Sequence, residues 1–267
     1  MAPSVNGDFN GGINYEHVYD NRIMLVHPLA PTPNKNKAVL GLPCRQKSYG
    51  KGRMASASSH FSEEQFRDVC LELQQPGVPG DNWELLVTCM GISIYQRLNQ
   101  PSGHYEYKAF GVLEDCPPGL LTDVYLDFNY RKNWDDFVKQ LYEEECNGEV
   151  VIYWELNCPS PKFNRDYVYV QQHREMEFNG QKVHVILAQN TSVPQFPEKS
   201  GVLRVRQYKQ RLAFQSNGRN GSKIFVYYYD SLDCPVPNWL FKWAAKKGVP
   251  TYLRNMVNAC HNYPRRS

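Results

Sequence analysis

The sequence predicts an α+β fold built on a curved antiparallel sheet of about nine strands. Short segments rich in β-branched and aromatic residues recur along the chain, turns containing Gly and Pro separate them, and helical patterns stand near both ends. Short strands joined by tight turns are typical of an antiparallel meander, which can curl around a groove.

The first helix is predicted to begin after Ser62. Ser62 and Gln65 have the spacing of a capping box, and Phe61 and Phe66 have that of a hydrophobic staple. Pro76-Gly77 then ends the helix. One helical face carries the apolar residues Phe66, Val69, Cys70 and Leu73.

Strand-like segments follow this helix, and a helical stretch interrupts them at 120–135. Residues 139–145 have a composition that favours a helix. The predicted strands are 83–87, 92–97, 105–112, 149–156, 166–173, 182–189, 201–214 and 223–230.

Strand alternation predicts which side chains face inward. The even-numbered residues of 149–156 share one face, so Trp154 points inward while Glu155 points away. Farther along, Tyr208 has the same parity as Arg204 and Arg206, so we expect a bulge or a mixed face near Arg206. The residues that share the face of Trp154 are Val150, Ile152 and Leu156.

The C-terminal segment 236–267 is predicted to form an amphipathic helix. It holds six Lys/Arg and no Asp or Glu, so its polar face is available to anionic lipid headgroups. A helix packed on the sheet with a solvated basic face is the alternative. The motif Gly248-Val249-Pro250 divides the helix as a hinge or as a fixed kink. The inward residues are Leu253, Met256, Val257 and Cys260, and the membrane-contact residues are Trp239, Lys242, Trp243, Lys246, Lys247 and Arg254.

Residues 1–53 differ in composition from the rest of the chain. They carry 7 Lys/Arg against 3 Asp/Glu, whereas residues 54–267 carry 23 against 24, so the folded part lacks the basic charge of a nucleic-acid binder. Asn, Gly, Pro and Lys dominate the first segment, which predicts a disordered extension. Met54 follows it and is a candidate alternative start.

The chain lacks the patterns of metal, cofactor or nucleophile chemistry. Its eight cysteines and seven histidines show no ligand spacing and no Cys-x-x-Cys pair, so we expect free thiols, no metal and no cofactor. There is no Gly-x-Ser-x-Gly elbow. No apolar run reaches the ~18 residues of a membrane span, and the first residues lack the pattern of a secretory signal, which indicates a cytoplasmic protein.

Three aromatic residues, Trp154, Tyr167 and Tyr208, lie on separate predicted strands. Aromatic faces brought together can surround a desolvated cation, and a quaternary ammonium such as choline is the ligand type that uses such a cage. Taken alone, the same residues are also typical of an ordinary core.

Several longer stretches resemble one known family. The run from Asn164 to Tyr169 (Asn-Arg-Asp-Tyr-Val-Tyr), with the stretches 61–66, 105–108 and 201–210, is similar to the StAR-related lipid transfer (START) family. Within that family the chain resembles members that carry phosphatidylcholine. The resemblance covers 61–263. It implies a START lipid-binding domain at 54–267 with the helix-grip fold, in which the sheet wraps a hydrophobic tunnel, a C-terminal helix closes it, and 139–145 is a strand.

The resemblance also implies the site residues. Trp154, Tyr167 and Tyr208 match the choline-cage positions of the family, and Leu156 and Gln210 line the same site. Tyr125 and Arg131 match residues that contact the lipid phosphate, and Asp135 forms a buried ion pair with Arg131. From spacing alone, Arg131 and Asp135 are also typical of a surface ion pair.

The function implied is transfer of one phosphatidylcholine molecule between membranes by a monomeric, non-enzymatic protein that touches a membrane surface. Two alternatives remain. One is a phosphatidylcholine sensor that regulates a partner, such as a thioesterase or a transcription factor. The other is a lipid hydrolase on the same fold, for which Asp135 is the one candidate water-activating base.

Overall fold

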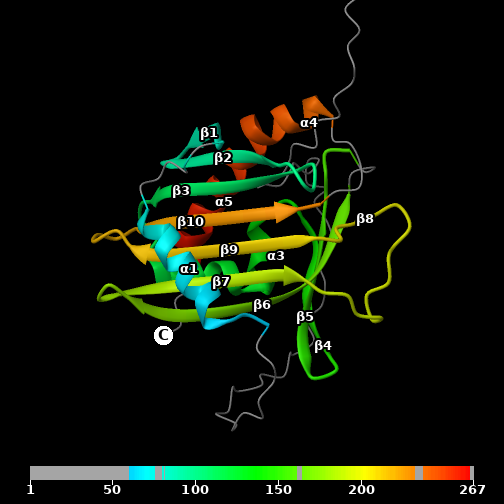
Figure 1. Cartoon of the computed structure of the whole chain (residues 1–267), viewed down its shortest axis with the longest axis horizontal. Coiled ribbons are helices and arrows are strands. Elements are labelled where there is room, and N and C mark those ends of the chain that lie inside the picture. Colours follow the sequence, from blue (N-terminus) through cyan, green and yellow to red (C-terminus); the bar gives the residue numbers. More distant parts are fainter. Residues whose placement is uncertain (1–59, 76–79, 81, 161–163, 232–236, 265–267) are drawn as a thin grey trace, which may run out of the picture.

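The computed structural model describes residues 60–264 except 76–79, 81, 161–163 and 232–236, so the segment 1–53 and Pro76-Gly77 lie outside the described residues. A curved, ten-stranded sheet dominates the described part, in the order β1-β2-β3-β10-β9-β7-β6-β5-β4 (Figure 1). Neighbours along this path are antiparallel, a short β8 pairs in parallel with β6, and the sheet stays open at β1 and β4. The predicted α+β class with an antiparallel sheet is confirmed. The strands are β1 Glu84–Cys89, β2 Ile92–Asn99, β3 His104–Leu113, β4 Val138–Cys146, β5 Glu149–Leu156, β6 Arg165–Phe178, β7 Gln181–Asn190, β8 Leu203–Arg204, β9 Tyr208–Ser216 and β10 Ser222–Asp230.

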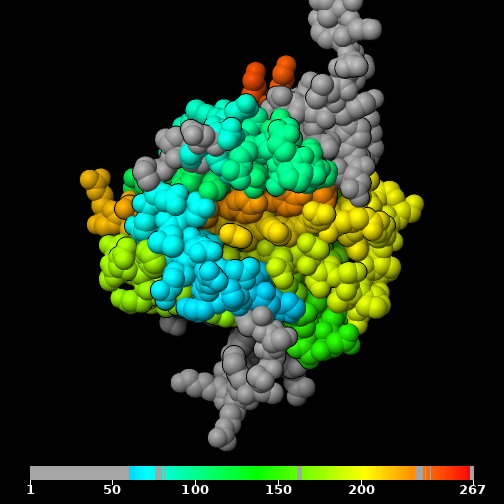
Figure 2. Space-filling view, in the orientation of Figure 1, coloured from blue at the N-terminus to red at the C-terminus, as the bar shows by residue number. Residues whose placement is uncertain are grey.

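Helices cover both faces of the sheet. α1 (Glu63–Gln74) crosses one face over β6, β7, β9 and β10 (Figures 1 and 2). α2 (Pro118–Leu126), α3 (Phe128–Trp134) and α5 (Val249–Asn262) contribute to a core on the other face. No helix among the described residues is both long and apolar enough to span a bilayer.

The start of α1 agrees with the sequence pattern. The Ser62 hydroxyl accepts a hydrogen bond from the Gln65 N–H, and the Gln65 side chain accepts one from the Ser62 N–H at 2.8 Å. The rings of Phe61 and Phe66 meet edge to face with centroids 6.4 Å apart. The predicted stripe is buried, because it packs on the apolar face of β6, β7, β9 and β10.

The helical stretch predicted at 120–135 is two helices. α2 ends at Leu126, and the Asp127 carboxylate then accepts a hydrogen bond from the Tyr130 N–H at 2.9 Å, which caps α3. An Asp at this position satisfies one of the free N–H groups that begin a helix. Arg131 lies in the last turn of α3 and is buried in the interior.

The strand at 139–145 is confirmed as β4, although its composition favours a helix. Its backbone pairs along nearly its whole length with β5. Tertiary pairing therefore outweighs the few tenths of a kcal/mol per residue that separate these residues in helix propensity.

The segment predicted as one strand at 201–214 is divided into β8 and β9. Arg204 donates two hydrogen bonds to the Asp166 carboxylate, at 2.8 and 3.0 Å, which holds β8 against β6. Tyr208 begins β9, and its N–H donates to the Asn190 side chain at 3.1 Å. The expected bulge near Arg206 is therefore a complete break, so Tyr208 faces inward independently of the arginines.

The even-numbered residues of β5 are buried on one face, except that Val150 at the start of the strand is exposed. Ile152, Trp154 and Leu156 lie in one buried cluster, whereas Val150 is 52% exposed. β6 pairs with β5 only from Ile152 onward, so Val150 lies beyond the paired part of its face, whereas Val151 on the other face is fully buried. Glu155 points away from this cluster as predicted, yet it is buried against Tyr153, Lys139 and Lys199.

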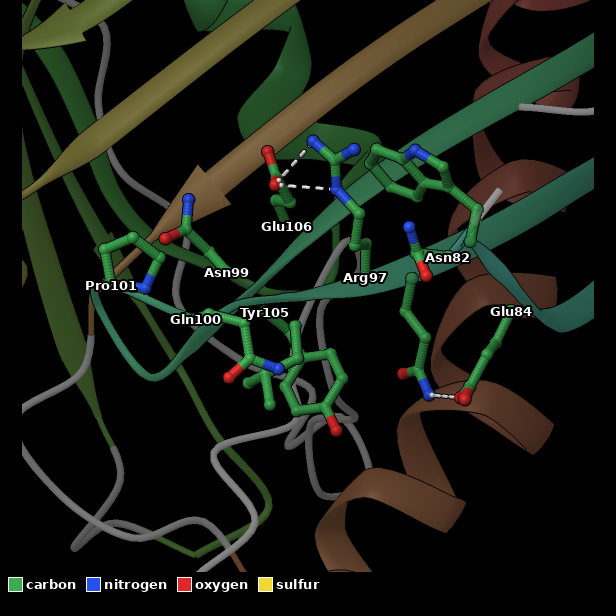
Figure 3. Close-up of a pocket in the computed structure, with 11 residues that line it drawn as sticks. Asn82, Glu84, Arg97, Asn99, Gln100, Pro101, Tyr105 and Glu106 are labelled. Atoms are coloured by element: carbon green, nitrogen blue, oxygen red, sulfur yellow. Dashed lines mark hydrogen bonds and ion pairs between the residues drawn. The ribbon is translucent and has the colours of Figure 1, made fainter. Parts of the chain in front are cut away.

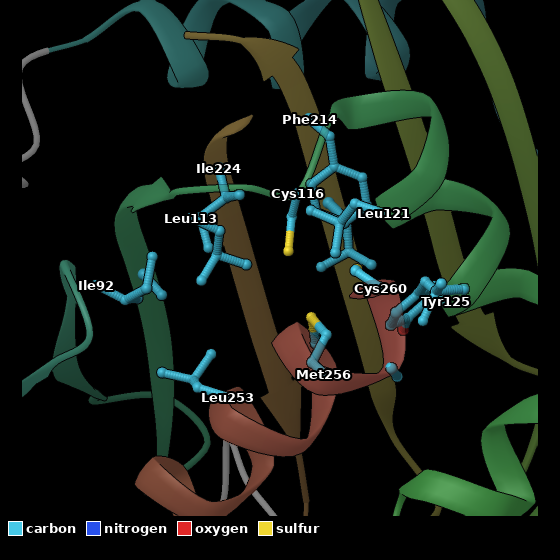
Figure 4. Packing of buried hydrophobic residues seen from close by; sticks show 14 of the residues in the cluster. Ile92, Leu113, Cys116, Leu121, Tyr125, Phe214, Ile224, Leu253, Met256 and Cys260 are labelled. Atoms are coloured by element: carbon cyan, nitrogen blue, oxygen red, sulfur yellow. The ribbon is translucent and has the colours of Figure 1, made fainter. Parts of the chain in front are cut away.

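The C-terminal helix continues through Gly248-Val249-Pro250. A short α4 (Asn238–Trp243) passes into a π-helical turn η2 (Ala244–Gly248), and α5 follows with the proline in its first turn. Pro250 directly follows the π-helical turn, in which the Val249 N–H donates to the Ala244 carbonyl five residues earlier, so the wider turn accommodates the proline within a continuous helix. Three of the four predicted inward residues, Leu253, Met256 and Cys260, are buried in the core shown in Figure 4. The fourth, Val257, is partly buried.

Two histidines on β6 and β7 allow a prediction on pH. Nε2 of His173 lies 3.3 Å from Nδ1 of His184, and burial lowers the pKa of both rings below their usual value. In acid, the unfolded chain therefore binds protons more readily than the folded protein does. The free energy of unfolding should fall as the pH drops below about 6.5. We expect a slope of up to about 1.4 kcal/mol per pH unit for each proton involved, measured by urea unfolding between pH 5 and 8.

The matched control is an exposed histidine on α5, His261. Changing His173 to Gln should flatten the acid limb of the stability curve, whereas His261→Gln should leave it in place. Equal acid limbs in the wild-type protein and in both variants would show that the histidine pair does not govern this pH dependence.

Candidate functional site

Three aromatic side chains from different strands meet on the inner side of the sheet. Trp154 of β5 and Tyr167 of β6 are partners across the strands, with ring centroids 4.9 Å apart, and Tyr167 lies 5.2 Å from Tyr208 of β9. All three are at most 4% exposed. We call these three residues the aromatic cluster.

The rings of the aromatic cluster pack against one another. Tyr167 touches the other two, and the Tyr167–Tyr208 contact is edge to face. A cation that binds to ring faces needs a position within about 6 Å of each centroid. In this structure the neighbouring rings occupy those positions, because they pack directly on one another. A trimethylammonium group would therefore have to move at least one of these rings before it contacts all three.

Two further tyrosines pack against the aromatic cluster. The rings of Tyr169 and Tyr228 lie 5.3 and 5.8 Å from that of Tyr208. Tyr169 could have been found from sequence because it shares the face of Tyr167 two residues earlier. Tyr228 could not, because three consecutive tyrosines at 227–229 give no sign of which one points inward.

Gln210 and Leu156 lie beside the aromatic cluster. The Gln210 side-chain oxygen accepts hydrogen bonds from the hydroxyls of Tyr208 and Tyr125, both at 2.7 Å. Leu156 is fully buried in the same group of side chains. Gln210 thus links the aromatic cluster to Tyr125, which comes from α2 on the opposite side of the interior.

A buried ion pair stands next to these residues. Nε of Arg131 donates to Oδ2 of Asp135 at 3.0 Å, and both side chains are at most 3% exposed. The other Asp135 oxygen accepts from the Phe137 N–H at 3.2 Å. Burial raises the pKa of Asp135, while the Arg131 guanidinium and the backbone N–H act in the opposite direction. The pair is therefore interior, one turn apart at the end of α3.

The guanidinium of Arg131 also faces aromatic rings. Its Cζ lies 5.0 Å from the ring centroid of Tyr125 and 5.1 Å from that of Trp154. A cation at this distance is attracted to a ring face. The ring of Trp134 lies 5.9 Å away, so Arg131 is held by one carboxylate and three rings, directly beside the aromatic cluster.

An apolar cavity of about 70 Å³ begins at Tyr125 and Gln210 and continues between the sheet and α5. Figure 4 shows Leu113, Leu253 and Met256 around this space. Pockets for drug-sized ligands measure roughly 300–1,000 Å³. Entry of a lipid with two acyl chains therefore requires these side chains, or α5, to move.

A larger hollow of about 920 Å³ lies along β1, β2 and β3, beside the turn that joins β2 to β3 (Figure 3). Its walls are polar, and they include the ion pair between Arg97 and Glu106 at 2.9 Å. None of the predicted site residues lines it. The sequence-predicted site thus corresponds to the small apolar cavity and the aromatic cluster instead.

The expected membrane-contact residues lie on α4, η2 and α5. Trp239 is 51% exposed, and Trp243 is partly buried against the core. The basic residues of this surface, Lys242, Lys246, Lys247 and Arg254, are exposed.

Asp135, the one candidate base for a hydrolase, already accepts hydrogen bonds from Arg131 and from the backbone. Among the described residues there is no group of three or more His, Cys, Asp or Glu that could hold a metal ion.

Comparison with known proteins gives consistent matches. The START domain model matches residues 63–266. The chain is 60% identical over 210 residues to the phosphatidylcholine transfer protein of Bos taurus, covering 79% of this chain and 99% of that protein. It is 57% identical over 210 residues to the Homo sapiens phosphatidylcholine transfer protein, covering 79% and 98%. In structure it is similar to human STARD10, with a TM-score of 0.63 and 21% identity over 80% of this chain and 84% of that one, which shows a shared fold.

Proposed function

This chain belongs to the START domain family, and on that premise we propose that it binds one phosphatidylcholine molecule between the sheet and α5 and transfers it between membranes. The observation that carries the proposal is the meeting of the aromatic cluster with the buried Arg131–Asp135 pair at one end of an apolar cavity. The names of the relatives, phosphatidylcholine transfer proteins at 57–60% identity, support the same ligand.

The choline group would bind against Trp154, Tyr167 and Tyr208. A quaternary ammonium has no N–H to donate, so ring faces are better partners for it than hydrogen-bond acceptors. Each ring contact contributes roughly 0.5–2 kcal/mol. Leu156 and Gln210 would border the choline, and ring separation would accompany its entry.

The phosphate would bind to Arg131 and Tyr125. A guanidinium has five N–H donors, so the bond from Nε to Asp135 leaves donors for a phosphate oxygen. Tyr125 lines the cavity, and its hydroxyl donates a hydrogen bond to the Gln210 oxygen at 2.7 Å. Asp135 would keep Arg131 in place and balance its charge when no phosphate is near.

The acyl chains explain why the lipid must be enclosed. Two chains of a phospholipid bring about thirty methylenes, and their exposure to water would cost on the order of 25 kcal/mol at ~0.8 kcal/mol each. A protein that replaces bilayer contacts by apolar side chains removes most of that barrier. This role requires no chemical step, which fits relatives named as transfer proteins.

The basic face at Trp239, Lys242, Lys246, Lys247 and Arg254 would touch the membrane. Each Lys or Arg near an anionic surface contributes about 1 kcal/mol, and an exposed Trp is suited to the bilayer interface. Because η2 and α5 continue this surface and α5 also lines the cavity, contact with lipid and opening of the cavity would occur along one continuous helix. Such a protein would work as a monomer in the cytoplasm.

The test is to purify the full chain under native conditions and identify its bound lipid by mass spectrometry, then to measure vesicle-to-vesicle transfer. We expect one phosphatidylcholine per chain, transfer of phosphatidylcholine in preference to phosphatidylethanolamine, faster transfer with anionic vesicles, and no hydrolysis products. Appearance of free fatty acid would favour the hydrolase instead. Binding without transfer would favour a sensor, for which affinity capture of a partner is the next measurement.

A further inference from the structure

A second buried charge pair lies behind the aromatic cluster. Arg165 begins β6 and Asp230 ends β10, and both side chains are at most 3% exposed. Nη1 of Arg165 lies 3.9 Å from Oδ2 of Asp230. Buried charges are costly unless a partner and hydrogen bonds stabilise them. Their presence so close to the proposed choline site therefore calls for an explanation.

Strand geometry points these residues toward the aromatic cluster. Arg165 and Tyr167 are two residues apart on β6 and share its inner face. Asp230 is the direct partner of Tyr208 across β10 and β9. The charge pair thus adjoins two of the three rings.

The Asp230 carboxylate holds one of these rings by its hydroxyl. Oδ2 of Asp230 accepts hydrogen bonds from the hydroxyls of Tyr167 at 2.8 Å and Tyr228 at 2.9 Å, and the two hydroxyls are 3.0 Å apart. Tyr167 is the ring that contacts both Trp154 and Tyr208. A ring tethered at its hydroxyl keeps the position of that end when its neighbours move, so Tyr167 is restrained from swinging away from the other two rings.

The charge of Asp230 has a second effect. The Arg165 guanidinium is almost fully buried, and its Nε and Nη2 have no hydrogen-bond partner among the described residues. A buried cation would repel a choline group nearby, because Coulomb forces are weakly screened in the interior. The neighbouring carboxylate offsets this repulsion.

We propose that Asp230 is a positioning residue for choline recognition, which holds the Tyr167 ring through its hydroxyl and neutralises Arg165. This inference rests on the proposed function, since it assigns a role in the same site. It predicts that the choline preference depends on a carboxylate that need not touch the lipid.

The experiment compares transfer of phosphatidylcholine and phosphatidylethanolamine between vesicles by the full chain. Asp230→Asn keeps the shape and removes the charge, and Tyr167→Phe removes the hydroxyl but keeps the ring and both charges. In each variant we expect the phosphatidylcholine transfer rate, divided by the phosphatidylethanolamine rate, to fall roughly 3- to 10-fold. This is less than the full effect of losing one cation–π contact, because the ring itself remains. Adding Arg165→Met to Asp230→Asn should recover part of the ratio, because the uncompensated cation is then absent.

The matched control is Tyr229→Phe, which removes a buried hydroxyl from the same strand that bonds to Gln207 instead, at 3.1 Å. It should leave the ratio unchanged. A wild-type ratio in both Asp230→Asn and Tyr167→Phe would overturn this inference alone. A wild-type protein that shows no preference for choline lipids would overturn the proposed function as well. If Asp230→Asn fails to fold, the ratio of transfer rates measured for Tyr167→Phe tests the role of the hydroxyl contact by itself.

Discussion

Replacing Asp135 by Ala should lower the free energy of unfolding by roughly 3–5 kcal/mol and cause loss of bound phosphatidylcholine. The reason is that Arg131 is at most 3% exposed and would keep its charge in the interior without a carboxylate. Urea unfolding gives the stability change, and mass spectrometry of the purified protein gives the lipid content. Unchanged unfolding together with full lipid content would contradict the role assigned to the pair.

A double variant separates stability from binding. Arg131→Met with Asp135→Leu removes both charges, and a buried ion pair replaced by apolar residues of similar size is often neutral or stabilising. We expect this variant to unfold near the wild-type midpoint and still to lose phosphatidylcholine, because no guanidinium remains for the phosphate. If it retains the lipid at wild-type stoichiometry, Arg131 is not the phosphate ligand.

Replacing Trp154 by Ala should both destabilise the protein and weaken choline recognition. The residue is 4% exposed, and truncation of a buried aromatic side chain costs about 3–5 kcal/mol. The preference for phosphatidylcholine over phosphatidylethanolamine in vesicle transfer should fall roughly 2- to 30-fold, which corresponds to one cation–π contact. Trp154→Phe, which keeps an aromatic face, should retain most of the preference.

A control outside the site distinguishes the two effects of Trp154→Ala. Phe225 is 1% exposed and packs beneath α1, on the opposite face of the sheet. Phe225→Ala should lose comparable stability yet keep the headgroup preference of the proteins that remain folded. A loss of preference in both variants would mean that the assay reports stability rather than choline recognition.

Local signals in the sequence predicted several elements because they act within a few residues. The capping box at Ser62 and Gln65 sets the start of α1 without help from the rest of the chain. Alternation likewise predicted that Trp154 points inward and Glu155 away. Helix capping and strand alternation both depend only on the backbone geometry of a few consecutive residues.

Features that depend on distant partners were missed. The break between β8 and β9 follows from the bonds of Arg204 to Asp166, 38 residues away in sequence. Val150 is exposed because β6 does not extend beside it. The position of Tyr228, and its bond to Asp230, depends on which of three tyrosines faces the interior. The resemblance to a family led to Arg131 and Asp135, whereas their spacing alone is equally typical of a surface pair.

The open edge of the sheet at β4 has a consequence for colloidal behaviour. An edge strand presents unpaired backbone N–H and C=O groups, to which a strand of another molecule can add. β4 carries the exposed acidic run Glu143, Glu144 and Glu145. Antiparallel addition of a second copy would bring these carboxylates close to their own counterparts, and like charges across strands are destabilising. The acidic run therefore protects a concentrated solution of this protein from edge-to-edge polymerisation, and more strongly at low salt than at high salt.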